Sequence, residues 1–93
     1  MTASEITHDP ARQRYSLMAD GKEAYLVYER PRPGVRNITH TIVPDAIGGR
    51  GYGQRLVKRA VEDAIAAGDR LMASCWFARA LIDKSPEWAA LKA

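Results

Sequence analysis

Four glycines fall within six residues, from Gly48 to Gly53, and an apolar-striped helical pattern follows them. In a turn without side chains, backbone N–H groups can converge on a ligand that comes close. The helix adds its unpaired N-terminal N–H groups and the positive end of its dipole. A strand, a glycine-rich turn and a helix N-terminus together favour binding of a phosphate or pyrophosphate. A plain turn needs fewer glycines, so we favour an anion-binding turn over a merely flexible one.

Cys75 and His40 are the side chains best suited to take part in catalysis. Cys75 ends a short apolar run and precedes a predicted helix, and a helix N-terminus activates a thiol. A lone cysteine is also commonly a small buried hydrophobic residue, so both interpretations stay open. A Cys75–His40 pair would combine a base with an activated thiol. The alternative for His40 is a strand histidine that hydrogen-bonds the backbone.

Composition limits the function classes. The 93-residue chain suits one small domain, residues 1–93, and a hydrophobic content of 46% supports a packed core. The net charge of +3 comes from scattered residues and does not favour nucleic-acid binding; Arg30, Arg32 and Arg36 are the residues that would carry it. Two histidines and one cysteine lack the spacing of metal ligands, so no metal site is expected.

The single cysteine can form no intrachain disulfide. The sequence begins without a secretory signal pattern, and no apolar run is long enough to span a bilayer. These features predict a cytoplasmic protein without a membrane segment.

The elements that must position these residues follow from periodicity. Alternating or β-branched residues predict strands, and rows of apolar residues at i and i+4 predict a helix that ends at Gly68. The predicted strands are 12–18, 23–29, 35–43 and 70–75; the predicted helices are 50–67 and 76–84, with a short helical turn in 86–93. Residues 1–10 are polar and are expected to be frayed. The predicted class is α/β (α+β), with a mostly antiparallel meander sheet, the order β-β-β-α-β-α and helices packed on the sheet.

Four short motifs occur in a fixed order: HTIVP at 40–44, GRGYG at 49–53, SCWF at 74–77 and SPEW at 85–88. In this order and spacing the chain resembles the GNAT acetyltransferase superfamily. It is most similar to the small, minimal GNAT-like proteins sometimes called the YjdJ-type family. The coenzyme motif of the superfamily is Arg/Gln-x-x-Gly-x-Gly/Ala, and Gly48 stands here at its first position.

The resemblance implies a single GNAT-like domain that transfers an acetyl group from acetyl-CoA to an amine, such as a lysine or N-terminus of a protein. It implies catalytic roles for Cys75 and His40. Cys75 would be acetylated transiently or would protonate the departing CoA thiolate. The residues expected to bind the coenzyme are Val43, Gly49, Arg50, Gly51, Tyr52, Gly53, Gln54 and Ser74.

Two departures from the family pattern leave an alternative open. Gly48 replaces the Arg or Gln of the coenzyme motif, and Arg50 is the side chain expected to compensate. Trp76 and Phe77 follow Cys75, where larger members of the superfamily often have a tyrosine acid; we expect both as walls of the acyl pocket or as core. The alternative is a non-catalytic acyl-CoA-binding or protein-interaction module with the same fold.

Overall fold

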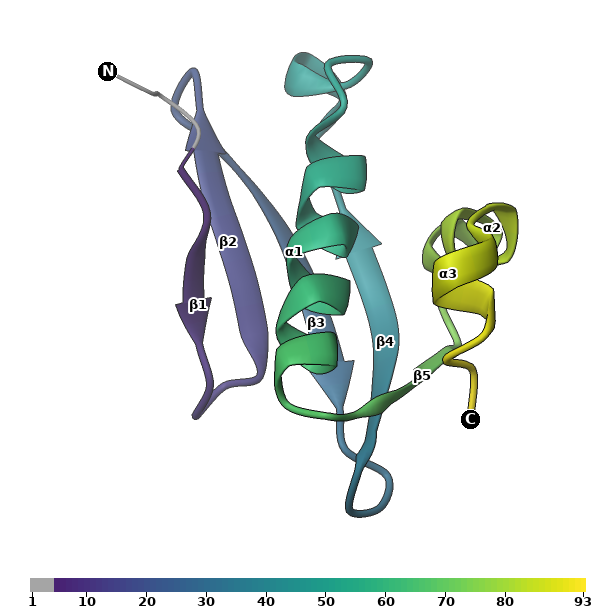
Figure 1. Ribbon diagram of the computed structural model, residues 1–93. Helices are drawn as coiled ribbons and strands as arrows, with labels where there is room; N and C mark the ends of the chain where they lie inside the picture. The colour runs from purple at the N-terminus through teal and green to yellow at the C-terminus, as the bar shows by residue number, and fades with distance from the viewer. Residues whose placement is uncertain (1–4) are drawn as a thin grey trace.

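The computed structural model describes residues 5–93 as a five-stranded sheet with helices against it (Figure 1). The elements are β1 (Thr7–Asp9), β2 (Arg14–Ala19), β3 (Lys22–Glu29), β4 (Val35–Ile42), the 3-10 turn η1 (Asp45–Ile47), α1 (Tyr52–Ala66), β5 (Arg70–Ala73), α2 (Trp76–Lys84) and α3 (Pro86–Ala89). The strands lie in the order β1-β2-β3-β4-β5. The predicted mostly antiparallel sheet with packed helices is confirmed, and β5 joins β4 in parallel.

The strand β1 was not predicted. It pairs antiparallel with β2, with Thr7 opposite Ser16 and Asp9 opposite Arg14. The expectation of a frayed segment is therefore wrong for 7–9, and for 1–4 it lies outside the described residues. Three residues without apolar alternation carry no periodic signal, so only their partner strand defines them.

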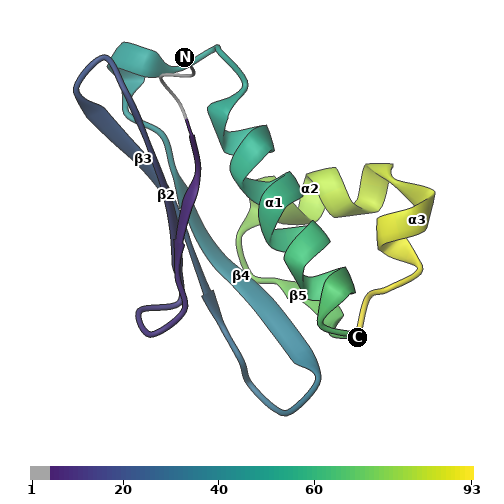
Figure 2. The same ribbon diagram turned by 60° about the vertical axis from the view of Figure 1, so that its left-hand side comes forward.

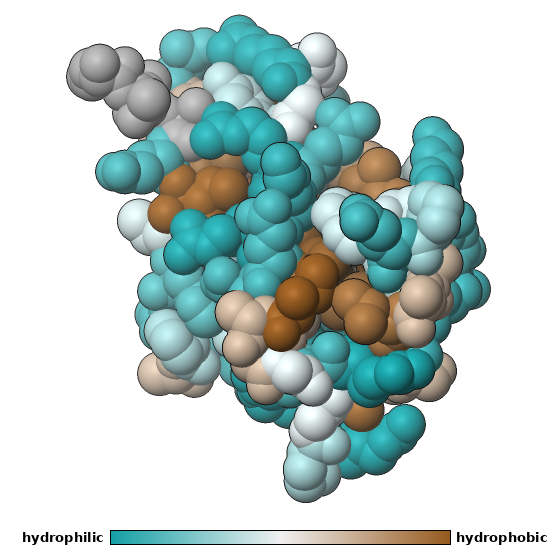
Figure 3. Space-filling view, in the orientation of Figure 1, coloured by the Kyte–Doolittle hydropathy of each residue, from teal (hydrophilic) through white to brown (hydrophobic). Residues whose placement is uncertain are grey.

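The core lies between the sheet and α1, and α1 and α2 cover the same sheet face (Figure 2). Its fully buried side chains come from alternate strand positions and from the predicted apolar rows of α1. They include Tyr15, Leu17, Leu26, Ile38, Leu56, Val57, Ala60, Val61, Ala64 and Leu71. The α2–α3 segment adds partly buried residues such as Leu81 and Trp88, and apolar surface gathers between α1 and α3 (Figure 3).

A buried polar network crosses this core. Arg36 is only 3% exposed, and its Nη1 donates to the Tyr15 hydroxyl at 2.9 Å. Its Nη2 lies 3.7 Å from the buried carboxylate of Asp69. The Tyr15 hydroxyl donates in turn to Asp63 at 2.7 Å. Burial, and then the hydrogen bond to Asp63, raise the pKa of Tyr15 far above its ordinary value, so it stays a neutral donor.

His8 connects β1 to this network. Its ring stacks on Tyr15 with the centroids 4.0 Å apart, and its Nε2 lies 2.8 Å from the Tyr28 hydroxyl. Burial lowers the pKa of His8 below its ordinary value of 6.5, although the charge of Asp63 opposes that shift. The folded chain therefore prefers the neutral imidazole.

We expect the free energy of unfolding to decrease as pH falls from 7 to 5. The unfolded chain then binds a proton at His8 that the folded chain binds more weakly, so the slope is at most about 1.4 kcal/mol per pH unit. Burial raises the pKa of Asp63, but the hydrogen bonds from Tyr15 and Arg59 outweigh burial and lower that pKa overall. The stability that ionised Asp63 contributes is therefore lost only below about pH 4.

Urea unfolding at pH 7, 6 and 5 measures this slope. His8→Gln should flatten it, whereas the matched variant His40→Gln, on an exposed imidazole, should keep it. An unchanged slope in His8→Gln would contradict the assignment to His8.

Candidate functional site

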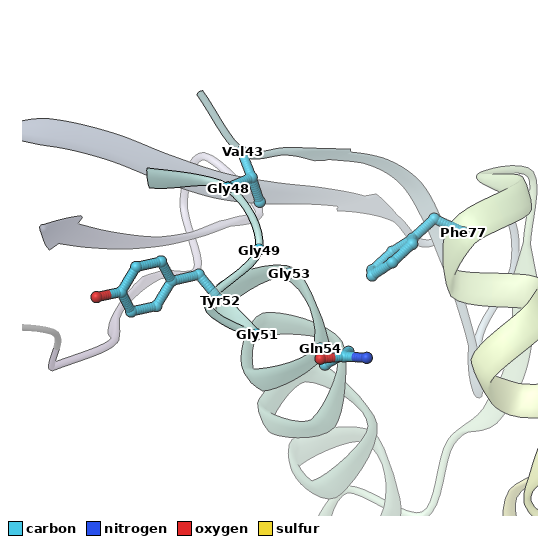
Figure 4. Close-up of a pocket in the computed structure, with 8 residues that line it drawn as sticks. All are labelled: Val43, Gly48, Gly49, Gly51, Tyr52, Gly53, Gln54 and Phe77. Carbon is cyan, nitrogen blue, oxygen red and sulfur yellow. The ribbon is translucent and has the colours of Figure 1, made fainter. Parts of the chain in front are cut away.

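A cavity of about 390 Å³ lies at the N-terminus of α1 (Figure 4). Its lining residues are Val43, Gly48, Gly49, Gly51, Tyr52, Gly53, Gln54 and Phe77. Six of the eight residues predicted to bind a coenzyme are among them. Phe77, from α2, faces the glycine turn across the cavity, whereas the Tyr52 ring is directed away from Phe77 (Figure 4).

The backbone around the turn supplies hydrogen-bond donors. Gly51 is the N-cap residue of α1 with φ of 82°, and no side chain caps the helix there. Gly49 also has a positive φ, 75°. The first N–H groups of a helix have no partner within it, and the first turn of α1 holds no acidic side chain to neutralise its dipole. The helix end at the cavity is therefore electropositive and suited to an anion.

Gly53 keeps the cavity open. A Cβ atom at this position would lie 3.1 Å from two atoms of the Phe77 ring and 3.4 Å from Cγ2 of Val43. Both neighbours line the cavity. A side chain here would enter the space that the turn leaves free, so the need for glycine at position 53 comes from a close approach and not from its backbone angle.

Arg50 and Ser74 are not among the lining residues. The Arg50 guanidinium forms an ion pair with Asp20 in the β2–β3 turn, with Nη1 and Oδ2 2.7 Å apart. Contrary to expectation, its side chain is not brought to the cavity, and Gly48 lines the cavity without a side chain. Ser74 is hydrogen-bonded to Asn37, through its backbone N–H and its hydroxyl.

The strands β4 and β5 part close to this cavity. Their parallel pairing runs from Val35 opposite Arg70 to Ile38 opposite Ala73. Beyond it β4 continues to Ile42 on β3 alone, with a register shift that leaves Thr39 as an extra residue. Such bulges bend a strand and are frequent beside active sites.

Cys75 lies at the point where the strands part. Its backbone N–H donates to the Ile38 carbonyl at 3.1 Å, and its Sγ lies 3.7 Å from Oγ1 of Thr41. Thr41 pairs with the buried Leu26, so it lies on the helix-covered face of the sheet. The sequence did not predict a role for Thr41, because only the turn after β5 brings Cys75 to it.

His40 lies on the other face, because successive strand residues point to opposite sides of a sheet. Its side chain is exposed, and its Nδ1 lies 3.2 Å from the Thr39 hydroxyl. The structure therefore does not form the predicted Cys75–His40 pair. The strand periodicity after the bulge separates the two side chains, although the residues are close in topology.

The two aromatic residues after Cys75 have different surroundings. Phe77 lines the cavity, whereas Trp76 is 75% exposed and is neither a wall of it nor core. Their rings meet edge to face with the centroids 6.4 Å apart. The prediction for Trp76 is therefore wrong, since the first turn of α2 directs it outward.

Residues 5–93 contain neither a candidate metal cluster nor a helix that could span a membrane. In that range no cluster of three or more His, Cys, Asp or Glu side chains could hold a metal ion. Within the same range no helix has the length and apolar content needed to cross a membrane.

Comparison with known proteins gives matches to a family model, to curated relatives and to a solved structure. Residues 14–91 match the family model of GCN5-related N-acetyl-transferase. Protein NATD1 of Bos taurus is 29% identical over 83 residues, which cover 87% of this chain and 74% of the relative. Protein NATD1 of Danio rerio is 26% identical over 87 residues, which cover 91% of this chain and 79% of the relative. The solution structure of a GCN5-like candidate N-acetyltransferase from Staphylococcus aureus superposes with a TM-score of 0.78 at 28% identity, covering 100% of this chain and 91% of that one.

Proposed function

Because the chain belongs to the GCN5-related N-acetyl-transferase family, we propose that it transfers an acetyl group from acetyl-CoA to an amine. The observation that carries the proposal is the cavity between the glycine turn and Phe77, at the N-terminus of α1. An electropositive helix end close to two diverging strands offers a place for a diphosphate and for a long arm that continues toward Cys75.

The residues present fit this coenzyme. Acetyl-CoA supplies an acetyl group activated as a thioester, together with a diphosphate that needs N–H donors. In the proposal the backbone N–H groups of 49–54 bind the diphosphate, and they do so whatever residue stands at position 48. Val43 and Phe77 contribute apolar walls to the cavity. This fit depends on backbone geometry and on a helix dipole, so it needs no arginine at the turn.

Cys75 is the proposed catalytic residue. The transferred amine must lose a proton, and the sulfur of the departing coenzyme must gain one. Cys75 either takes the acetyl group before the amine does or donates the proton to the sulfur, with the Thr41 hydroxyl beside it. His40 remains a candidate base for the amine and not for Cys75, since it lies on the opposite face.

The acceptor proposed is an amine on another protein, a lysine or an N-terminus. The exposed Trp76 stands next to Cys75 and offers an apolar contact to an approaching chain. A cytoplasmic location is part of the proposal and rests on the single cysteine, which suits a reducing compartment.

A second candidate function is binding of acyl-CoA without turnover. Gly48 favours it, since the first position of the coenzyme motif has no side chain here. Trp76 and Phe77 favour it too, because neither can act as the acid that a tyrosine supplies.

Calorimetry with acetyl-CoA and intact-mass measurement test both proposals. We expect the wild type to bind the coenzyme, and Cys75→Ala to bind it equally while transfer to a peptide amine falls at least about 100-fold. An acetyl adduct present in the wild type and absent from Cys75→Ala would identify Cys75 as the group that is acetylated. His40→Ala serves as the matched control and should retain any such adduct.

The two proposals fail differently. Absence of coenzyme binding would overturn both. Binding without transfer to any amine, in the wild type, would support the acyl-CoA-binding function instead.

A further inference from the structure

We propose that Thr41 is a positioning residue for Cys75: its hydroxyl accepts a hydrogen bond from the thiol, and donates one to the sulfur once the thiol has lost its proton. The inference rests on the proposed function for its link to turnover. Its structural part stands on the bulge in β4 and on the contact between the two side chains, and it can be tested without any transfer reaction.

Regular strand pairing would place His40 level with Cys75. The parallel ladder ends with Ile38 opposite Ala73, and Cys75 lies two residues beyond Ala73. In an unbroken strand the residue two positions beyond Ile38, which is His40, would lie at the same level and on the same face as Cys75. The exposed His40 side chain lies instead on the other face of the sheet.

The bulge in β4 puts Thr41 in that place. Tyr28 pairs with Ile38, and Leu26, two residues earlier, pairs with Thr41. Three residues of β4 therefore span two steps of the ladder, and Thr39 is the extra one. Tyr28 and Leu26 are both buried on the helix-covered face. Thr41 thus returns to that face, at the level of the thiol.

A hydroxyl can serve both protonation states of a cysteine. The Cys75 thiol donates to Oγ1 of Thr41, with Sγ and Oγ1 3.7 Å apart. A thiol is a weak donor, whereas the hydroxyl has an O–H of its own that can rotate. When the thiol becomes a thiolate, this O–H can turn to the sulfur as a charge-assisted donor. A backbone carbonyl can only accept and an amide N–H can only donate, so neither could do both.

The Cys75 sulfur becomes an anion in either of its proposed roles. As a nucleophile it gives up its proton and forms a bond to the acetyl carbon; the bond from that carbon to the coenzyme sulfur breaks, and the coenzyme sulfur takes the proton. As an acid it gives its proton to the coenzyme sulfur as that bond breaks, and regains one from the amine that has taken the acetyl group. The Thr41 hydroxyl therefore acts at the charged stage in both cases.

Thr41 does not line the coenzyme cavity, whereas Val43, two residues later, does. The hydroxyl thus stands between the cavity wall and the thiol along β4 without being part of the wall. Its loss should lower turnover and leave coenzyme binding in place, a split that marks an interaction made only during the reaction.

Three variants separate this role from a general loss of packing. Thr41→Val removes the hydroxyl and keeps a β-branched side chain that suits a strand, and Thr41→Ser keeps the hydroxyl. Thr39→Val is the matched control, because it also removes a bonded hydroxyl from β4, one that donates to the Val27 carbonyl at 3.1 Å. Since the sequence has one cysteine, iodoacetamide reports on Cys75 alone. Circular dichroism confirms that each variant is folded.

The alkylation rate should rise with pH in every variant, because the thiolate is the reacting form. In Thr41→Val we expect the midpoint of this profile at least about half a pH unit higher, since a donor to the thiolate is lost. Thr41→Ser and Thr39→Val should stay within about 0.2 pH unit of the wild type. A change in access to the sulfur would alter the plateau rate and not the midpoint.

Acetyl transfer should show the same order of variants. We expect kcat of Thr41→Val to fall at least about fivefold, with KM for acetyl-CoA within about twofold, and kcat of Thr41→Ser to stay within about twofold of the wild type. If Thr41→Val does not fold, Thr41→Ala carries the same expectations.

A midpoint within about 0.2 pH unit of the wild type in folded Thr41→Val would overturn the proposal. So would an equal shift in Thr39→Val, or a Thr41→Ser variant that behaves like Thr41→Val. A wild type that neither binds nor uses acetyl-CoA would refute the proposed function, while the pH profiles of alkylation would still decide the role of Thr41.

Discussion

Replacing Arg36 with methionine should lower the free energy of unfolding by about 3 kcal/mol or more, the range for breaking a buried ion pair. The guanidinium is almost fully buried, donates to Tyr15 and lies beside Asp69. Among residues 5–93, the Asp69 carboxylate, also buried, would then keep only the ion pair to the half-exposed Arg30, at 2.8 Å. Urea unfolding followed by circular dichroism measures the loss.

Two control variants sharpen this prediction. Arg36→Lys keeps the charge but loses the planar fork that reaches Tyr15 and Asp69 together, so its loss should be intermediate. Arg30→Met removes a largely solvated partner, and screening limits its effect to about 1 kcal/mol. A loss below about 1 kcal/mol in Arg36→Met would show that the network adds little to stability.

Gly53→Ala should weaken acetyl-CoA binding at least about tenfold, or about 1.4 kcal/mol, without unfolding the protein. The added Cβ would lie 3.1 Å from the Phe77 ring, so the ring or the turn must move within the cavity. Alanine also gains about 0.5–1 kcal/mol of helix propensity, which offsets the crowding in the folded state. Calorimetry and thermal unfolding, measured together, should therefore show weak binding at nearly unchanged stability.

Gly21→Ala is the matched control, with the opposite outcome. Gly21 has φ of +73° in the β2–β3 turn and open space around its Cβ position. Its replacement should lower stability by about 1–2 kcal/mol through backbone strain and leave coenzyme binding unchanged. Adding Phe77→Leu to Gly53→Ala should relieve the crowding. A dissociation constant for Gly53→Ala within about twofold of the wild type would contradict the role of Gly53.

The parts of the fold that the sequence predicts are those with local causes. Alternation and the i, i+4 rows predict β2, β3, β4 and α1 to within two residues, because each pattern reflects which face is buried. The glycine turn is also local, since its conformation depends on the absence of side chains at Gly49 and Gly51. Six of the predicted coenzyme-binding residues line one cavity for that reason.

The missed features depend on partners far away in the sequence. Arg50 pairs with Asp20, thirty positions earlier, so its direction could not follow from the turn. The sequence groups Arg36 with Arg30 and Arg32 as candidate contacts to nucleic acid, because a charged residue on a strand gives no sign of burial without Tyr15 and Asp69.

The separation of His40 from Cys75 has a different origin. It depends on a bulge in β4, where the single extra residue Thr39 places His40 on the face opposite Cys75. Shifts of one residue leave the hydrophobic pattern almost intact, so periodicity does not reveal them.

The parallel pairing of β4 with β5 also bears on how the protein folds. The antiparallel strands join neighbours along the chain, whereas β4 meets β5 only after α1 has crossed the sheet. Closing that longer loop costs more entropy, so we expect this pair to form after the hairpins. The junction that holds Cys75 is then among the last parts to assemble, and a nascent chain gains its proposed chemistry only once the sheet is complete.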